Sequence, residues 1–273
     1  DQARRYADNP AMLMWYLWDE PNEGQARELR DHNAWRHAFD RHHPTFIASC
    51  RPDLFKMHAS FADVFAMDPY TSSAQVLEWC RRAQKEVAGD LHKPVVVIPW
   101  ADSKPGDIPF QAWIAIVHDA RGIIWYCWSQ VGGGPSGVGI WDKPEKQAIY
   151  KELLPLIKTV QPGITSVQRR CFEAGDLHGI VGGDHPGQRY LIVLNVNENA
   201  KAAPDAEGGL AIPELKGIRT VFLPQQRIPK KDKDGKEMKD RDGKTILEDA
   251  ALTITPGIFS ETLAPREVRI WRF

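Results

Sequence analysis

The feature that most constrains the fold of this 273-residue chain is an apolar run that ends in two acids. Residues Met12–Trp18 contain no charged side chain, and Asp19, Glu20 and Pro21 follow directly. An unbroken apolar run of this length predicts a strand buried on both faces, as in a parallel sheet. Such a strand needs no carboxylate pair at its end, but the carboxyl ends of strands are where α/β barrels place catalytic groups. We therefore interpret Glu20 as a catalytic acid.

Residues 1–165 alternate apolar runs with amphipathic segments. The apolar runs predict strands at Met12–Trp18, Thr45–Ser49, Val64–Asp68, Pro94–Trp100 and Ile123–Trp128. The amphipathic segments predict helices at Gln25–Arg41, Ser73–Ala88, Phe110–Ala120 and Lys143–Val160. This alternation predicts an α/β fold with a parallel sheet and right-handed crossovers. Five strands are too few for a closed eight-stranded barrel, and no glycine-rich phosphate loop follows a strand, as a nucleotide-binding open sheet would require.

Residues 166–273 follow a different pattern, of short alternating runs separated by turn residues. Examples are Tyr190–Val196, Arg219–Leu223 and Glu267–Phe273. This pattern predicts a second, antiparallel all-β domain, built as a sandwich. Two Asp-Gly pairs in the charged stretch Lys230–Lys244 predict a solvated hairpin. The alternative, a calcium loop, lacks the downstream glutamate of an EF-hand.

The composition argues against several classes of function. The net charge of −1 gives no electrostatic basis for binding nucleic acid or an anionic membrane surface. No apolar run reaches the ~18–20 residues that a membrane span needs. The four cysteines are widely spaced, without a Cys-x-x-Cys pair, so neither a zinc site nor a disulfide framework is predicted. We therefore expect no metal and no cofactor.

Glu20 is suited to the cleavage of a glycosidic bond. That reaction needs a protonated carboxyl group to assist the leaving group and a second group to stabilise an oxocarbenium-like centre. The aromatic neighbours Trp15, Tyr16 and Trp18 can raise the pKa of Glu20 by desolvation. The alternative for Asp19 and Glu20 is a structural role, in which they cap the next helix or pair with arginines.

The ends of three later strands carry further candidate site residues. They are Asp68 and Tyr70, then Trp100 and Asp102, then Trp128 and Gln130. A tyrosine beside a carboxylate can hydrogen-bond a substrate or a nucleophile, and a tryptophan can stack on a sugar ring. Each has a structural alternative: Asp68 can begin a turn, and the tryptophans can be core residues.

The segment Asn9–Pro21 resembles the fourth-strand motif of clan A TIM-barrel glycoside hydrolases and their uncharacterised bacterial relatives. In that group the Glu before the Pro is the general acid/base, which corresponds to Glu20 here. Segments that resemble strands five to eight follow in the same order: His43–Thr45, Asp63–Tyr70, Lys93–Val97 and Asp119–Tyr126. The tail resembles the small β-sandwich that follows many such barrels, at Tyr190–Asn195 and Leu263–Trp271. The resemblance implies strands four to eight of a (β/α)8 barrel in residues 1–165 and an accessory β-sandwich in residues 166–273.

The sequence departs from the family pattern at the nucleophile. In the clan this is a Glu at the end of the seventh strand, but Pro94–Ala101 contains none, and Asp102 is the nearest acid. The usual Asn before the acid/base is Asp19 here. An Asp-Glu pair resembles that of substrate-assisted N-acetylhexosaminidases, in which the Asp orients a 2-acetamido group that acts as the nucleophile.

The sequence also contains only the fourth of the first four barrel strands. We expect the N-terminal half-barrel to have been removed, or to be supplied as a separate polypeptide partner that completes the fold. The resemblance alone implies a secreted or periplasmic location.

Two hypotheses of function follow. The first is a glycoside hydrolase acting on a poly- or oligosaccharide, with Glu20 as acid/base and Asp19 or Asp102 as the partner carboxylate. The second is a non-catalytic carbohydrate-binding or structural protein on a degenerate barrel, which the missing seventh-strand Glu favours. The separation of the two carboxyl groups discriminates between mechanisms: about 5–5.5 Å suits a retaining enzyme and roughly 6.5–9.5 Å an inverting one.

Overall fold

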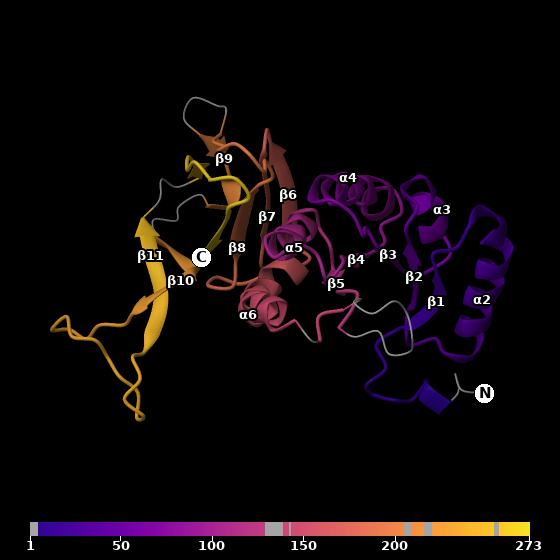
Figure 1. Ribbon diagram of the computed structural model, residues 1–273, viewed down its shortest axis with the longest axis horizontal. Helices are drawn as coiled ribbons and strands as arrows, with labels where there is room; N and C mark the ends of the chain where they lie inside the picture. The colour runs from indigo at the N-terminus through magenta and orange to yellow at the C-terminus, as the bar shows by residue number, and fades with distance from the viewer. Residues whose placement is uncertain (1–4, 129–138, 142, 205–208, 216–219, 254–256) are drawn as a thin grey trace. The chain divides into compact units, whose positions relative to one another are not determined.

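The computed structural model describes residues 5–128, 139–141, 143–204, 209–215, 220–253 and 257–273 (Figure 1). The chain divides into two compact units, Asp1–Ile149 and Tyr150–Phe273, and each is described by itself. None of the helices in the described ranges has both the length and the hydropathy needed to cross a membrane.

The first unit is built on a five-stranded parallel sheet. Its strands lie in sequence order: β1 (Trp15–Asp19), β2 (Thr45–Ser49), β3 (Val64–Met67), β4 (Val95–Val97) and β5 (Gly122–Ile123). Each strand pairs in parallel with the next, which confirms the predicted parallel sheet. Every residue of β2, β3 and β4 is buried, as expected for strands covered on both faces. The same prediction for Met12–Trp18 is wrong, because Leu13 and Tyr16 are exposed.

Helices connect these strands. They are α2 (Ala26–Phe39), α3 (Phe55–Ala59), α4 (Ser73–Ala83) and α5 (Asp107–Val117), together with the 3-10 helices η1 (Glu23–Gln25) and η2 (Pro52–Leu54) and the π-helix η3 (Gln84–Gly89). Before α4, the Ser72 side chain accepts a hydrogen bond from the Gln75 amide. Helix α5 begins three residues before the predicted start at Phe110, because Pro109 fits a first helical turn.

A β-bulge in β1 decides which side chains share a face. The pairing of β1 with β2 shifts by one residue between Tyr16 and Trp18, which interrupts the simple alternation of side chains. Trp15 and Trp18 therefore both contact aromatic rings of α2, at centroid distances of 6.2 and 5.3 Å. Tyr16 and Asp19 share the other face, where their side chains are hydrogen-bonded.

The sheet face that carries Tyr16 has its own apolar core. Its buried members alternate along β2, β3 and β4: Phe46, Ala48, Val64, Ala66, Val96 and Ile98. Because side chains on a strand repeat every second residue, Asp68 continues the row of Val64 and Ala66. It does so at the carboxyl end of β3, where the apolar row ends.

The second unit contains a six-stranded antiparallel sheet, which confirms the predicted change from parallel to antiparallel pairing. The strands lie in the order β11 (Leu247–Thr253), β10 (Thr220–Pro229), β13 (Val268–Arg272), β8 (Tyr190–Asn195), β7 (Leu177–Gly182) and β6 (Arg169–Ala174). A separate two-stranded sheet pairs β12 (Ile258–Phe259) with β9 (Leu210–Ala211), and a turn η4 (Pro213–Leu215) follows β9. Helix α6 (Pro144–Thr165) contains the boundary between the two units and ends five residues beyond the predicted Val160.

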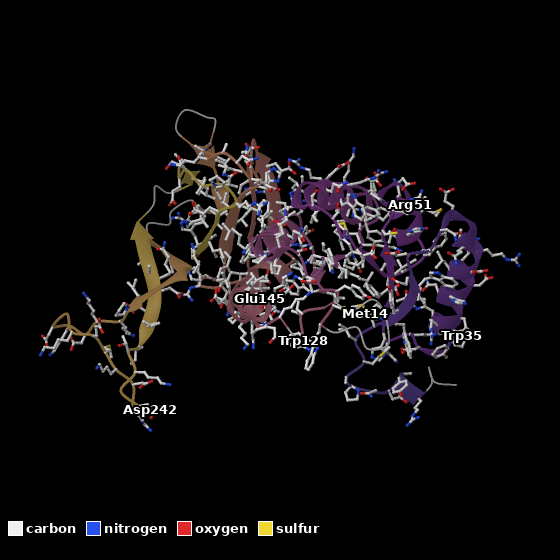
Figure 2. The ribbon with its side chains drawn as sticks, viewed as in Figure 1. Met14, Trp35, Arg51, Trp128, Glu145 and Asp242 are labelled. Carbon is white, nitrogen blue, oxygen red and sulfur yellow. The ribbon has the colours of Figure 1, made fainter. Side chains whose placement is uncertain are left out.

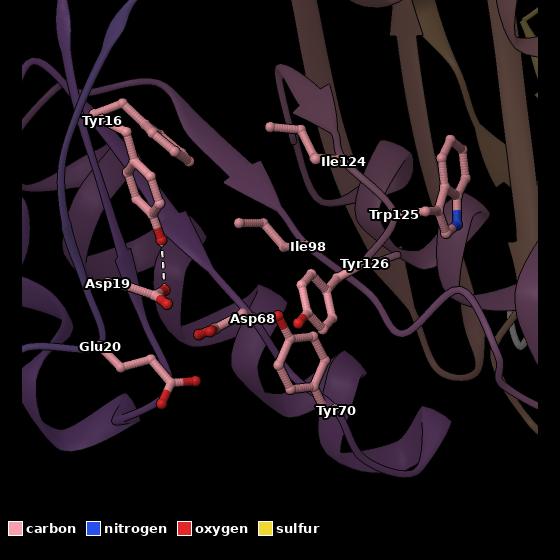
Figure 3. A pocket seen from close by; sticks show the side chains of 10 residues that line it. Tyr16, Asp19, Glu20, Asp68, Tyr70, Ile98, Ile124, Trp125 and Tyr126 are labelled. Atoms are coloured by element: carbon pink, nitrogen blue, oxygen red, sulfur yellow. Dashed lines mark hydrogen bonds between the residues drawn. The ribbon is translucent and has the colours of Figure 1, made fainter. Parts of the chain in front are cut away.

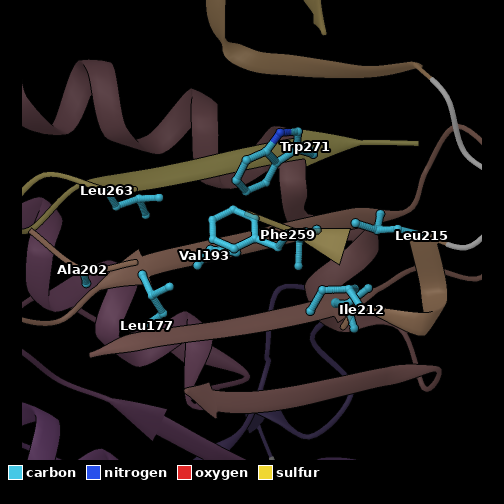
Figure 4. Close-up of a cluster of buried hydrophobic side chains, with 10 residues drawn as sticks. Leu177, Val193, Ala202, Ile212, Leu215, Phe259, Leu263 and Trp271 are labelled. Carbon is cyan, nitrogen blue, oxygen red and sulfur yellow. The ribbon is translucent and has the colours of Figure 1, made fainter. Parts of the chain in front are cut away.

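A second hydrophobic core lies between the two sheets of this unit (Figure 4). Its centre is Trp271 of β13, whose ring packs edge-on against Phe259 of β12 at a centroid distance of 5.3 Å. Leu177, Val193 and Leu263 complete the cluster from β7, β8 and the segment before β13.

The charged stretch between β10 and β11 forms two tight turns, each closed by an aspartate. Asp232 Oδ1 accepts hydrogen bonds from the amides of Asp234 and Lys236. Asp240 repeats this arrangement eight residues later, and Asp242 lies at the tip of its turn (Figure 2). The aspartate oxygens thus close backbone turns, as the hairpin interpretation predicts.

Candidate active site

A pocket of about 440 Å³ lies in the first unit, at the carboxyl ends of the parallel strands (Figure 3). Its lining combines three acids with aromatic and aliphatic side chains: Tyr16, Asp19, Glu20, Phe46, Asp68, Tyr70, Ile98, Ile124, Trp125 and Tyr126. Four of the candidate residues from the sequence, Asp19, Glu20, Asp68 and Tyr70, are therefore brought together. They come from the ends of β1 and β3, which β2 separates in the sheet.

Asp19 is held in place by a tyrosine of its own strand. The Tyr16 hydroxyl donates a hydrogen bond of 2.5 Å to Asp19 Oδ1. Burial and this hydrogen bond raise the pKa of Tyr16, so the phenol keeps its proton and remains a donor. The Tyr16 ring is itself supported by Phe46 of β2, at a centroid distance of 4.7 Å. The bulge in β1 makes this pairing possible because it puts Tyr16 and Asp19 on one face.

Glu20 has an unusual backbone conformation. Its φ angle is +46°, in the left-handed region that glycine adopts freely and glutamate rarely. The Glu20 amide still donates to the Ala48 carbonyl, at 3.2 Å, so the chain turns immediately after pairing with β2. Residues held in such conformations cluster at functional sites. The turn directs the Glu20 side chain toward the pocket (Figure 3).

Asp68 is the most buried acid of the pocket, with 3% of its surface exposed. Its amide pairs with the Ser49 carbonyl, and Oδ1 has no hydrogen-bond partner in the described part of the chain. Burial, a hydrogen bond with Glu20 and the negative charge of Glu20 raise the pKa of Asp68 to about 8. At neutral pH the Asp68–Glu20 pair therefore holds a proton, which is the condition a general acid requires.

A thiol adjoins the same acid pair. Burial and the nearby Glu20 carboxylate raise the pKa of Cys50 to about 11. The thiol therefore stays protonated at neutral pH and is not activated as a nucleophile. Its position directly after β2 places it between the strand ends that carry Glu20 and Asp68.

Two tyrosines form the aromatic side of the pocket. The rings of Tyr70 and Tyr126 lie 5.5 Å apart between centroids. Burial and the charge of Asp68 raise the pKa of Tyr70, so its hydroxyl also remains a hydrogen-bond donor. Tyr126 follows β5, and its backbone bridges to Trp100.

Three other candidate residues, Trp100, Asp102 and Trp128, do not belong to this lining. Asp102 forms ion pairs with Lys143 and Lys146. Burial opposes ionisation of Asp102, but the two ammonium groups outweigh it and lower the pKa. Trp100 and Trp128 are 39% and 58% exposed, respectively, and neither lines the pocket. Gln130 lies outside the described residues.

The sequence indicates Tyr16 only as an aromatic neighbour of Glu20, not as a partner of Asp19, and it indicates no pocket role for Tyr126. Tyr16 belongs to the apolar run of β1, where it reads as one more core aromatic. In a regular strand, residues three apart, such as Tyr16 and Asp19, lie on opposite faces. They share a face here because a bulge lies between them, and the sequence does not indicate that bulge. Tyr126 likewise lies in an apolar run, Ile123–Trp128, that predicts a buried strand.

Comparisons with known proteins identify the fold. No family model matches the sequence, and no curated protein matches it. The structure is similar to that of an Anoxybacillus α-amylase, with a TM-score of 0.52 and 9% identity, over 90% of this chain and 56% of that one. This likeness shows that the chain has a fold found in glycoside hydrolases, as the sequence resemblance predicts.

More distant matches cover a similar share of their chains. A Thermotoga maritima α-L-arabinofuranosidase matches with a TM-score of 0.41 and 9% identity, over 94% of this chain and 65% of that one. A Geobacillus stearothermophilus GH27 β-L-arabinopyranosidase matches with a TM-score of 0.46 and 11% identity, over 89% of this chain and 54% of that one. The chain thus spans about half to two thirds of the length of these three solved structures.

Proposed function

We propose that this chain carries the active site of a glycoside hydrolase, with Glu20 as the general acid/base. The observation that carries the proposal is the convergence of three acids in one pocket, at the carboxyl ends of a parallel sheet. One of these acids, Asp68, keeps a proton near neutral pH because of burial and of its contact with Glu20. Protonation of a glycosidic oxygen needs a carboxyl group in this state.

Each polar group of the pocket has a role in this proposal. The Asp68–Glu20 pair shares one proton, which Glu20 passes to the leaving oxygen, and the Glu20 carboxylate then takes a proton from the incoming water. Asp19, oriented by Tyr16, stabilises positive charge on the sugar ring as the glycosidic bond breaks. Tyr70 donates a hydrogen bond to the substrate. We leave Asp102 out of the site because its charge is neutralised by two lysines.

We further propose that the parallel sheet corresponds to strands four to eight of a (β/α)8 barrel, and that the second unit is its accessory β-sandwich, with the division at residues 165–166. The parallel order of β1 to β5 and the acids at their carboxyl ends support the first part. The comparisons give no support to a separate N-terminal half-barrel polypeptide. The proposal therefore rests on the pocket of this chain alone.

The test is turnover of a panel of aryl glycosides by the wild type and by Glu20→Gln. The swap is nearly isosteric and removes the transferable proton, so we expect at least about a hundredfold loss of kcat with the melting temperature preserved. Glu23→Gln is the matched control, since Glu23 is exposed and lies outside the pocket lining. Full activity in Glu20→Gln would refute the assignment. The anomer formed first, followed by NMR, would show whether the enzyme retains or inverts configuration.

The second candidate is carbohydrate binding without catalysis. It is favoured by the missing Glu at the end of β4, the strand that resembles the clan's seventh. In that case the wild type would bind oligosaccharides in the pocket but hydrolyse none of the aryl glycosides, and Glu20→Gln would bind as the wild type does.

A further inference from the structure

We propose that the pocket recognises an amino sugar, a saccharide unit bearing a primary ammonium group that is held by the carboxyl groups of Asp19, Glu20 and Asp68. The inference rests on the proposed function and names the substrate class of the same pocket. It is carried by the charge of the lining, by an unsatisfied buried oxygen and by the aromatic rings around them.

Among the described residues, the lining is acidic and contains no cation. Three carboxyl groups converge there, and none of the ten described residues around the cavity is a lysine, arginine or histidine. An anionic sugar, such as a uronate or a sulfate ester, would meet only like charge and would be repelled. A neutral sugar would leave the charge of the acids unpaired. An ammonium group is the sugar substituent whose positive charge complements the negative charge of these acids.

One carboxyl oxygen of the pocket, Asp68 Oδ1, receives no hydrogen bond from the described residues. Asp68 is 97% buried, lines the cavity, and its Oδ1 has no hydrogen-bond partner among the described residues. A buried acceptor without a partner is costly, and native proteins rarely leave one. An ammonium group supplies three donors, enough for Asp68, Asp19 and Glu20.

The aromatic side chains of the pocket suit the same ligand. The rings of Tyr70 and Tyr126 lie 5.5 Å apart between centroids, and Phe46 and Trp125 add further rings to the lining. The faces of aromatic rings attract cations, most strongly where water is excluded. The rings can also pack on the apolar face of the sugar, so one pocket can hold both parts of the ligand.

The titratable groups around Asp68 predict how many protons the pocket releases when the ligand binds. They come from β1, from the segment after β2 and from the ends of β3 and β5: Tyr16, Asp19, Glu20, Cys50, Tyr70 and Tyr126. With no cation among them, Asp68 keeps its proton at neutral pH, with a pKa of about 8. A bound ammonium favours the carboxylate form, so the proton leaves Asp68 for solvent as the amine binds, and Glu20 takes up a proton from solvent before it acts as the acid. A hydroxyl or acetamido sugar does not displace it.

The experiment compares matched methyl glycosides that differ only at position 2. For each of the gluco, galacto and manno configurations, the amino, hydroxyl and N-acetylamino forms are titrated calorimetrically at about pH 6, where a sugar amine is charged. We expect the amine to bind about tenfold more tightly than its hydroxyl partner in at least one configuration. Titration in two buffers of different ionisation enthalpy should show release of up to about one proton for the amine only.

Two variants test whether the preference for the amine depends on the acids of the pocket. Asp68→Asn, checked for folding by circular dichroism, should lose both the amine preference and the proton release. Glu23→Gln, outside the lining, should keep both. Equal affinity of amine and hydroxyl forms, binding of none of the nine sugars, or a full amine preference in folded Asp68→Asn would each overturn the inference.

The outcome is separable from that of the proposed function. Hydrolysis of neutral aryl glycosides without any amine preference would leave the hydrolase standing and overturn the amino-sugar inference. Amine binding with proton release, but without turnover of any aryl glycoside, would support the amino-sugar inference and overturn the hydrolase proposal.

Discussion

Asp68 makes the stability of the folded chain depend on pH. An aspartate in an unfolded chain titrates near pH ~4, whereas burial and Glu20 raise the pKa of Asp68 in the folded state to about 8. Between these values the folded state holds a proton that the unfolded state has lost. The free energy of unfolding therefore falls as the pH rises from about 4 to about 8.

Asp68→Asn should remove this dependence. Relative to the wild type, we expect the variant to gain at least about 1 kcal/mol in free energy of unfolding between pH ~5 and pH ~9. Urea denaturation of both proteins at the two pH values measures the change. Asp31→Asn, on the exposed face of α2, is the control that should follow the wild type. Parallel pH profiles for wild type and Asp68→Asn would show that Asp68 is ionised throughout.

The backbone of Glu20 allows a second test at the residue scale. Asparagine accepts the left-handed conformation far better than glutamate or glutamine, and Glu20 has a φ of +46°. Glu20→Asn should therefore be more stable than Glu20→Gln by about 1 kcal/mol in urea denaturation. Both variants remove the charge beside Asp68, so their difference isolates the backbone. Equal stabilities would mean that the turn after β1 is not strained.

At the scale of elements, the sequence predicts the sheet well and its irregularities poorly. The rule that functional side chains follow parallel strands located Asp19, Glu20, Asp68 and Tyr70, which the structure gathers in one pocket. It could not locate Tyr16, because the bulge that pairs Tyr16 with Asp19 leaves no mark in an all-apolar run. Bulges depend on how a strand meets its neighbour, and a single strand does not encode that.

The end of helix α6 is a second feature that the sequence pattern does not predict. The sequence predicts a helix over Lys143–Val160, but the helix continues through Pro162 and Gly163 to Thr165. Gly163 packs closely on the antiparallel sheet: a Cβ there would lie 2.8 Å from the Tyr190 ring and 3.0 Å from the Gly182 carbonyl oxygen. The tertiary contact, which local propensity does not contain, explains why glycine occupies a helical position.

Gly163→Ala should therefore destabilise the second unit, although alanine favours a helix. The propensity gain of about 1 kcal/mol is outweighed by the clash with backbone and ring, for a net loss of about 1–3 kcal/mol. Thermal or urea unfolding measures it, with the exposed Lys158→Ala of the same helix as control. A more stable Gly163→Ala would mean that the helix end moves freely away from the sheet.

At the scale of the whole molecule, each compact unit has a hydrophobic cluster of its own among the described residues. One lies under the pocket, around Ala66 and Val96, and the other around Trp271 and Phe259. A domain that contains its own core can unfold as its own cooperative unit. The two compact units should therefore respond separately to core mutations.

Phe259→Ala tests this independence. Phe259 is 4% exposed and packs against Trp271, so its truncation should cost the second unit about 3–5 kcal/mol. Hydrogen exchange followed by mass spectrometry should show lost protection in peptides from β7, β8 and β13. Peptides from β2 and β3 should stay protected, and pocket ligands should bind as before. Val64→Ala, in the first core, is the reciprocal variant and should open β2 and β3 alone. If either variant exposed both sets of peptides together, the pocket would depend on the β unit for its stability, and activity assays would require the full chain.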